Sequence, residues 1–410
     1  MTETATTATS LPTVQSPRQP SIRVLLAGGG TGGHLVPAIA LAQALRERDA
    51  NTPILFVGAA DRMEALAVPA AGFDFAPISV HGLMGRWSLS GLMRRLRGAL
   101  EVLSGLPLWQ SIAILRRFRP DVVVGTGGYV CGPVLLAAWL RRIPTLLLEQ
   151  NEDPGATSRL VMPIVSAAAV VSEGAARPFR KRGVRVETVG TPVRPLVMAT
   201  TREEGVRALG LSPSRKTLAI LGGSLGSRAV NSAAAGALKA LAEQEWFRSG
   251  WQTVHITGRG RDGAPMVAEM KGLGVRYTAY DFRDDVHHVL AAADAVVTRA
   301  GGTFLAEISA RGIPMVVVPW SGAAQDHQTH NALPFAEAGA AIIISDSELT
   351  ATRLAATLES LLPDEGRLRA MAEACRSLGH PEATDRILTT IRELCAARQE
   401  KRPGRGGGRK

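Results

Sequence analysis

The sequence predicts an α/β protein of two domains, each built around a parallel β-sheet with helices on both faces. The chain has 410 residues, which is too long for one ordinary hydrophobic core. Runs of β-branched residues alternate with helical patterns along the whole chain. Each half also carries two glycine-rich loops directly after predicted strands. Ligands of such sheets bind at the carboxyl ends of the strands, so we expect the four loops to face one interdomain cleft.

The predicted strands fall into two series separated by a proline-containing hinge. The first series is 23–27, 54–57, 122–125, 145–148, 168–171 and 187–189, and the second is 218–221, 253–257, 275–278, 295–298 and 315–319. A prolyl stretch at 194–202 leads into a helix and marks the hinge. We therefore expect domains at 21–195 and 196–397. The Thr-, Ser- and Pro-rich residues 1–20 and the basic, Gly-rich residues 398–410 are expected to be disordered.

The loop at 28–34 reads Gly-Gly-Gly-Thr-Gly-Gly-His and follows a predicted strand. Glycines lack Cβ atoms, so the loop can close on an anion, and the helix that begins near His34 adds the positive end of its dipole. The same glycines satisfy the G-x-G-x-x-G pattern of dinucleotide-binding folds. A nicotinamide site needs an acidic residue directly after the second strand, and Asp61 comes late, so a dehydrogenase is disfavoured.

Composition narrows the cofactors and partners. Cys131, Cys375 and Cys395 are an odd number without metal-ligand spacing, which suits a reducing cytoplasm better than a disulfide scaffold. The apolar runs are shorter than the ~20 residues that span a bilayer. A formal charge of +11 calls for an anionic partner. Aromatic residues are few and no nucleic-acid motif occurs, so anionic lipid or an anionic substrate ranks ahead of nucleic acid.

Six short motifs occur in order along the two halves. They are Gly-Gly-Gly-Thr-Gly-Gly-His at 28–34, Gly-Thr-Gly-Gly-Tyr-Val-Cys-Gly-Pro at 125–133, Glu-Gln-Asn at 149–151, Gly-Gly-Ser-Leu-Gly-Ser-Arg at 222–228, Arg-Ala-Gly-Gly-Thr at 299–303 and Asp-His-Gln-Thr-His-Asn-Ala at 326–332. Together they resemble the MurG family of GT-B glycosyltransferases, from about residue 22 to about residue 391. Two departures are Leu148, where a His often precedes Glu-Gln-Asn, and Glu152-Asp153-Pro154, where a plainer loop is usual.

The resemblance implies a GT-B fold of two facing Rossmann-like domains, with the donor UDP-N-acetylglucosamine held mainly by the second. Glu307 would accept hydrogen bonds from both ribose hydroxyls and would be exposed at the cleft. Ser224 would face the diphosphate, and Gln328 the N-acetylglucosamine ring. The full set expected at the donor is Thr31, Gly32, Gly33, Asn151, Arg194, Ser224, Gly302, Thr303, Glu307 and Gln328. From position alone, Glu307 could equally be a solvated helix glutamate and Asp326 a helix cap.

The acceptor falls to the first domain, where the glycine loops would hold the pyrophosphate of a lipid-linked muramoyl pentapeptide. By resemblance its ligands are Gly30, Thr31, Gly128 and Tyr129. His34 is the candidate general base, because an imidazole titrates near neutrality and this one stands at a helix start beside the loop. The alternative is that His34 only hydrogen-bonds substrate or backbone.

The reaction implied is an inverting displacement in which an acceptor hydroxyl attacks the anomeric carbon opposite UDP. No Asp-x-Asp occurs in the chain, so neither a metal nor another cofactor is indicated, and loop dipoles and arginine would neutralise the leaving UDP. A diacylglycerol glycosyltransferase, a UDP-N-acetylglucosamine 2-epimerase and a non-catalytic nucleotide-binding protein remain alternatives.

Residues 81–106 interleave apolar and basic side chains, as a membrane-docking surface requires. Leu89, Leu92, Leu96 and Leu100 repeat at helical spacing and are expected to face the core. The remaining side chains expected at an anionic membrane are Leu83, Met84, Trp87, Met93, Arg86, Arg94, Arg95 and Arg97. The sequence therefore predicts a peripheral protein on the cytoplasmic face of the cell membrane.

Overall fold

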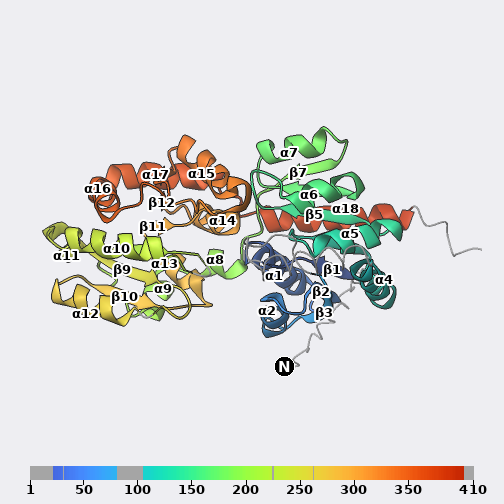
Figure 1. Ribbon diagram of the computed structural model, residues 1–410, viewed down its shortest axis with the longest axis horizontal. Helices are drawn as coiled ribbons and strands as arrows, with labels where there is room; N and C mark the ends of the chain where they lie inside the picture. The colour runs from blue at the N-terminus through green and yellow to red at the C-terminus, as the bar shows by residue number, and fades with distance from the viewer. Residues whose placement is uncertain (1–21, 31, 81–104, 224–225, 262, 401–410) are drawn as a thin grey trace, which may run out of the picture.

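The computed structural model describes residues 22–30, 32–80, 105–223, 226–261 and 263–400, and it forms two α/β domains side by side (Figure 1). Three segments lie outside these ranges: residues 1–20, residues 81–104 of the predicted docking stretch 81–106, and the tail from 401. Within them, no helix is both long and apolar enough to cross a bilayer.

The first domain has a seven-stranded parallel sheet in the order β3-β2-β1-β4-β5-β6-β7. Its strands are β1 (Val24–Ala27), β2 (Ile54–Ala59), β3 (Asp74–Ile78), β4 (Val122–Gly125), β5 (Thr145–Glu149), β6 (Ala167–Val170) and β7 (Arg185–Thr188). Its helices are α1 (Gly32–Arg48), α2 (Glu64–Ala70), α4 (Leu106–Phe118), α5 (Cys131–Leu140), α6 (Ala156–Val161), the 3₁₀ turn η1 (Met162–Ile164) and α7 (Glu173–Arg180).

The second domain has a six-stranded parallel sheet in the order β10-β9-β8-β11-β12-β13. Its strands are β8 (Lys216–Leu221), β9 (Trp251–Ile256), β10 (Tyr277–Tyr280), β11 (Ala295–Thr298), β12 (Met315–Val317) and β13 (Ala341–Ile343). The helices of this half are α8 (Pro195–Ala199), α9 (Arg202–Ala208), α10 (Arg228–Leu241), α11 (Glu245–Gly250), α12 (Ala264–Gly272), α13 (Val286–Ala292), α14 (Gly302–Arg311), η2 (Ala324–Asp326), α15 (His327–Glu337), α16 (Ala351–Leu361), α17 (Glu365–Leu378) and α18 (Ala383–Glu400).

Both sheets are buried on two faces, which explains their continuous apolar strands. Leu25 of β1 shares a core with Leu135 of α5, whereas the next residue, Leu26, shares a core with Leu41 of α1 on the other face. The strand order reverses between β1 and β4 in the first sheet and between β8 and β11 in the second. Loops diverge at such switch points and leave room for a ligand. The predicted fold class is confirmed.

Two strands escaped the sequence analysis, β3 and β13. Both lie at sheet edges. β3 is only partly buried and contains Asp74 and Pro77, which the edge position tolerates because one side of the strand needs no partner. β13 is apolar, but it has only three residues, two of them half-buried, which is shorter than the runs of four to eight residues that indicate a strand.

Helix α18 returns to the first domain after the chain has completed the second (Figure 1). Its Ile387, Leu388 and Ile391 enter the core that contains β1 and α1. Arg398 donates to the carbonyl oxygens of Pro120 at 2.9 Å and Asp121 at 3.0 Å, just before β4. The structure thus differs from the sequence-based division, which placed residues 383–397 in the second domain and began the disordered tail at 398.

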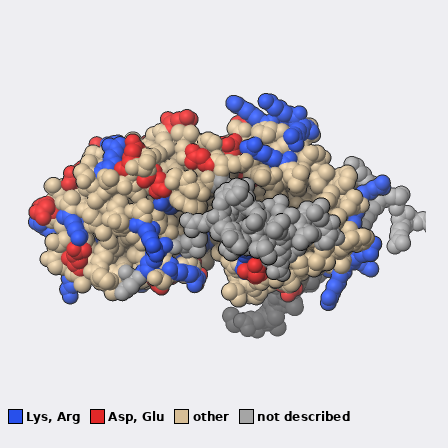
Figure 2. Space-filling view, viewed as in Figure 1, with Lys and Arg blue, Asp and Glu red and all other residues tan. Residues whose placement is uncertain are grey.

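Basic side chains gather on parts of the first domain, including the region over α7 (Figure 2). Arg177, Lys181 and Arg182 are exposed there. The three cysteines are buried and unpaired, and burial raises the pKa of the Cys131 thiol to about 12. This thiol therefore stays protonated at neutral pH and is part of the core rather than a reactive group.

Candidate functional site

The loops after β1 and β4 pack against each other so closely that side chains are excluded. A Cβ on Gly28 would lie 1.9 Å from Thr126 Oγ1, and one on Gly128 would lie 2.4 Å from the Gly29 carbonyl oxygen. Gly128 also has a φ of +79°, which favours glycine. The switch point of the first sheet is therefore made of backbone, as a site for a phosphate group requires.

His34 lies in the first turn of α1, against the loop after β4. Its Nδ1 is 3.0 Å from the Thr126 carbonyl oxygen and 3.3 Å from Gln150 Oε1. A carbonyl oxygen can only accept, so this contact assigns the proton to Nδ1. The neutral ring then has a lone pair on Nε2, which is the form a general base needs.

Gly30 differs from the sequence expectation. Its N–H donates to both carboxylate oxygens of Glu64 at 3.2 Å, and Glu64 is fully buried at the start of α2. This N–H is thus taken by a protein carboxylate and does not face an open anion site. The Tyr129 ring covers the same residue, 3.0 Å from where a Cβ of Gly30 would lie. Burial raises the pKa of Tyr129 despite the opposing charge of Arg62.

Two other members of the predicted set begin α1. Gly32 is the first residue of the helix and Gly33 is the second. The amide groups of a first helical turn have no intrahelical acceptor, so they remain available to an anion. Thr31 lies outside the described residues.

The loops of the second domain meet those of the first at α14. Thr303 Oγ1 donates to the Gly33 carbonyl oxygen at 2.8 Å, across the two domains. A Cβ on Gly302 would lie 2.2 Å from the Gln150 carbonyl oxygen, so only glycine allows this approach. The amino end of α14 therefore touches residues on both sides of the candidate base.

Asn331 of α15 makes a second set of interdomain contacts. Its Nδ2 donates to Asn151 Oδ1 at 3.1 Å, and its Oδ1 accepts from the Glu152 N–H at 3.0 Å. Asn151 is held in turn by Glu149, whose carboxylate accepts from its backbone and side-chain N–H groups at 3.1 Å each. The Glu-Gln-Asn motif thus provides a second point at which the first domain hydrogen-bonds the second.

Glu307 is not exposed at the cleft as the sequence analysis expected. It is 1 % exposed, and its two carboxylate oxygens accept from Arg194 Nε at 2.6 Å and Nη2 at 2.7 Å. The reason is that Arg194, at the start of α8, reaches α14 from the interdomain linker. Such a bidentate pair is a strong, specific contact. The structure therefore brings together two residues predicted to bind different parts of the donor.

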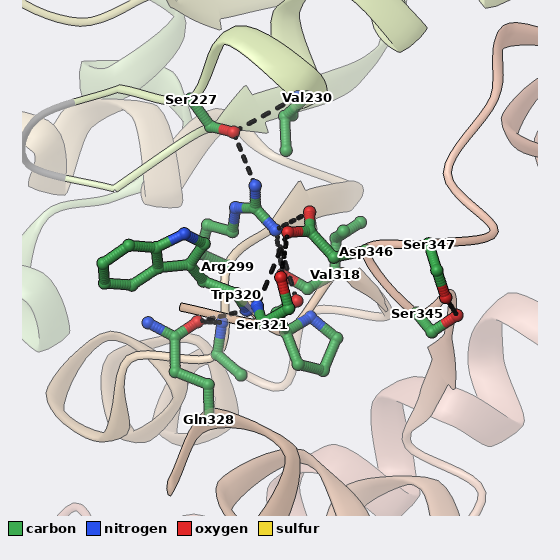
Figure 3. A network of polar contacts seen from close by, with 12 residues as sticks. Ser227, Val230, Arg299, Val318, Trp320, Ser321, Gln328, Ser345, Asp346 and Ser347 are labelled. Atoms are coloured by element: carbon green, nitrogen blue, oxygen red, sulfur yellow. Dashed lines mark hydrogen bonds and ion pairs between the residues drawn. The ribbon is translucent and has the colours of Figure 1, made fainter. Parts of the chain in front are cut away.

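Gln328 lies beside a buried polar network in the second domain (Figure 3). Its Oε1 accepts from the N–H groups of Ala300 at 3.2 Å and Trp320 at 2.9 Å. The acceptor end of the amide is therefore fixed by two backbone N–H groups. Asp326 stands at the N-cap of this helix but makes no capping hydrogen bond with its side chain.

The centre of that network is Arg299, which the sequence analysis quoted in a motif without giving it a role. Arg299 donates to Asp346 Oδ1 and to Ser227 Oγ at 2.7 Å each. Partial burial opposes ionisation of Asp346, but hydrogen bonds from Arg299 and Ser321 outweigh it and lower the pKa of that carboxyl. The contact to Ser227 ties the loop after β8 to the loop after β11. Ser224 lies outside the described residues.

Gln150, Asn331 and Glu64 were also missed as site residues. For Asn331 a signal was present, because it follows Gln328 by three positions and so lies on the same side of a helix. For Gln150 and Glu64 the partners are distant in sequence.

In the described ranges no group of three or more His, Cys, Asp or Glu could hold a metal ion. A hollow of about 330 Å³ lies elsewhere, lined by Lys216, Asp294 and Arg311 among others, and none of the predicted site residues lines it.

Comparison with known proteins agrees with this geometry. Residues 24–170 match the Glycosyltransferase family 28 N-terminal domain, and residues 217–387 match the Glycosyltransferase family 28 C-terminal domain. The fold and the paired loops therefore place the chain among two-domain glycosyltransferases of GT-B architecture. The chain belongs to the family of UDP-N-acetylglucosamine–N-acetylmuramyl-(pentapeptide) pyrophosphoryl-undecaprenol N-acetylglucosamine transferases, the MurG family.

Individual relatives support the assignment over nearly the full length. The transferase of that name from Halothermothrix orenii is 38 % identical over 384 residues, covering 91 % of this chain and 99 % of the relative. The crystal structure of Acinetobacter baumannii MurG has a TM-score of 0.69 at 25 % identity, covering 91 % of this chain and 100 % of its own. A putative UDP-N-acetylglucosamine 2-epimerase from Listeria monocytogenes has a TM-score of 0.64 at 16 % identity, covering 95 % and 100 %, a likeness of fold alone.

Proposed function

We propose that this protein transfers N-acetylglucosamine from UDP-N-acetylglucosamine to undecaprenyl-pyrophosphoryl-muramoyl pentapeptide, with inversion, in peptidoglycan synthesis. The observation that carries the proposal is the placement of His34. Its Nδ1 proton is engaged by the Thr126 carbonyl, and the adjacent Gly33 contacts Thr303 of the second domain. The His34 imidazole, with its Nδ1 proton engaged, thus stands where the glycine loops of both domains meet.

The chemistry follows from these positions. His34 Nε2 takes the proton of the acceptor hydroxyl as its oxygen forms a bond to the anomeric carbon, and the bond from that carbon to UDP breaks with its electron pair. Backbone N–H groups in the first turn of α14 stabilise the charge on UDP, together with the Arg194 guanidinium, which also pairs with Glu307. Gln328 donates to the sugar hydroxyls through its NH₂ group.

The epimerase alternative is less well supported. Curated relatives at 35 to 40 % identity over about 90 % of the chain carry the transferase name, whereas an epimerase structure shares the fold at 16 % identity. An epimerase acts on soluble donor and needs no lipid acceptor. The experiment incubates labelled UDP-N-acetylglucosamine with the muramoyl-pentapeptide lipid, and we expect label to enter the organic phase. Conversion of the labelled donor without lipid would favour the epimerase.

We expect activity to survive exhaustive chelation, because the sequence has no Asp-x-Asp pair and UDP can be neutralised by backbone dipoles and arginine. The measurement is initial rate after treatment with EDTA, with detergent-dispersed acceptor to separate effects of cations on the lipid. Full loss of activity, restored by one particular divalent ion, would overturn metal independence.

We further propose that the first domain docks on the cytoplasmic face of the membrane. The stretch predicted for this role lies outside the described residues, but the neighbouring helices α4 and α5 expose large apolar side chains. Trp109 is 66 % exposed and Trp139 49 %. Basic residues surround them on the same pair of helices and their ends: Arg116, Arg117, Arg141 and Arg142, all exposed. Apolar and basic side chains combined suit an anionic interface.

Replacing these four arginines with Gln is expected to weaken binding to anionic vesicles by at least about tenfold, because each contributes roughly 1 kcal/mol near such a surface. The readout is cosedimentation at low salt, and raised salt should weaken the parent protein in the same way. Turnover on a water-soluble acceptor analogue should not change. The matched control removes the same charge from the second domain, at Arg207, Arg276, Arg353 and Arg367. Equal sedimentation of the two variants would exclude α4 and α5 as the docking face.

A further inference from the structure

Gln150 makes contacts that none of the roles above accounts for. It is 4 % exposed at the carboxyl end of β5. Its Nε2 donates to the Thr126 carbonyl oxygen at 3.0 Å, and its Oε1 lies 3.3 Å from His34 Nδ1. The same Thr126 oxygen is 3.0 Å from His34 Nδ1. The Thr126 carbonyl, the Gln150 amide and the His34 imidazole therefore all contact one another, and the Nδ1–H of His34 faces two acceptors.

This arrangement fixes both the ring and its tautomer. The Gln150 NH₂ group holds the Thr126 carbonyl in place, and two acceptors at Nδ1 disfavour the tautomer with its proton on Nε2. Gly127 completes the fit, since a Cβ there would lie 2.4 Å from His34 Nδ1. His34 thus presents Nε2 without freedom to flip.

The backbone of Gln150 faces the other domain. Its carbonyl oxygen lies under Gly302, where a Cβ would approach to 2.2 Å. On the other side of His34, the Gly33 carbonyl accepts from Thr303. The first two residues of α14 therefore touch the residue before the base and the residue that holds it.

We propose that Gln150 is a positioning residue that sets the tautomer and orientation of His34 and ties them to the seating of the donor-binding helix α14. The inference rests on the proposed function, in which His34 is the base. Gln150 acts through Thr126 and His34 and touches no reacting atom. Its loss should lower kcat more than it raises the KM for donor.

Other ionisable groups near His34 have partners of their own. Glu64 accepts from Gly30, and Glu149 accepts from Asn151 and Gly155. Cys131 donates to the Ala27 carbonyl oxygen, and Glu307 on α14 is paired with Arg194. Because these groups are engaged elsewhere, a charge introduced at position 150, beside His34 Nδ1, would have the most direct effect on the imidazole.

The test compares the kcat–pH profiles of Gln150→Met and Gln150→Glu with that of the parent protein. Gln150→Met keeps the volume but loses both contacts, and we expect kcat to fall about tenfold or more with nearly unchanged donor KM. Gln150→Glu places a carboxylate beside Nδ1–H. An opposite charge stabilises imidazolium, so the acid limb should move to higher pH by about one unit or more.

Controls separate this role from a structural one. Gln252 is a buried amide of the second domain that bonds Ser212 through both ends at 2.9 Å, and Gln252→Met should leave the acid limb in place. Donor binding by each variant shows that it is folded. If Gln150→Met does not fold, the profile of Gln150→Glu decides alone. An acid limb unchanged in Gln150→Glu overturns the positioning role. Normal turnover in His34→Ala would instead overturn the base assignment on which the role rests.

Discussion

Replacement of His34 by Ala is expected to lower turnover by roughly 10²-fold or more at saturating substrates, because the acceptor hydroxyl loses its base. The ring hydrogen-bonds Thr126 and Gln150 in the first domain, and in the described ranges no hydrogen bond from the His34 side chain to the second domain is found. The apparent affinity for UDP-N-acetylglucosamine should therefore change little. The measurement is kcat from initial rates, with donor affinity from calorimetry.

The control for this variant is its thermal unfolding, since loss of a half-buried ring can also loosen the loops around it. A folded His34→Ala protein with near-normal turnover would return His34 to substrate positioning. Such a result would leave the transfer reaction itself untouched, because donor and acceptor would still be brought together.

The fold was predictable because its central strands carry a signal of their own. Residues 122–125 and 295–298 are short apolar runs, and both became strands buried on two faces beside a switch point. A strand buried on both faces needs apolar, often β-branched residues at every position, and this requirement does not depend on which helices cover the sheet. Edge strands such as β3 are not selected in this way, and Asp74 and Pro77 interrupt the apolar pattern by which a strand is recognised. Helix α18 could not be assigned to a domain, because its apolar stripe shows that it packs but not on which sheet.

The candidate site was predictable only where backbone makes it. The glycine loops were found because close approach excludes side chains, as it does at Gly128 and Gly302. Side-chain pairing across long separations left no such trace. Arg194 and Glu307 are 113 positions apart, and His34 and Gln150 are 116 apart. The motifs named these residues, but only the fold shows which of them meet.

Because Glu307 is buried and paired, its replacement by Ala is expected to cost stability as well as donor affinity. Removing one partner of a buried ion pair costs about 3–5 kcal/mol, and the lower end applies here since Arg194 is 21 % exposed and can be partly solvated. If Glu307 also receives the ribose hydroxyls, loss of those bonds weakens UDP-sugar binding by a further ~1.5–3 kcal/mol. Unfolding in urea and donor titration measure the two effects separately.

The double variant Arg194→Ala with Glu307→Ala separates the contribution of Glu307 to stability from its contribution to donor binding. It leaves no unpaired buried charge, so much of the stability should return, while donor affinity should stay low. Glu365→Ala is the control, because its pair with Lys216 is exposed and screened by solvent, so its loss should change stability little. Glu307→Gln keeps a hydrogen-bonding side chain of the same shape and should lose less affinity than Glu307→Ala. Unchanged donor affinity in all Glu307 variants would remove the ribose role and leave the pair with Arg194 as a structural link between α14 and the interdomain linker.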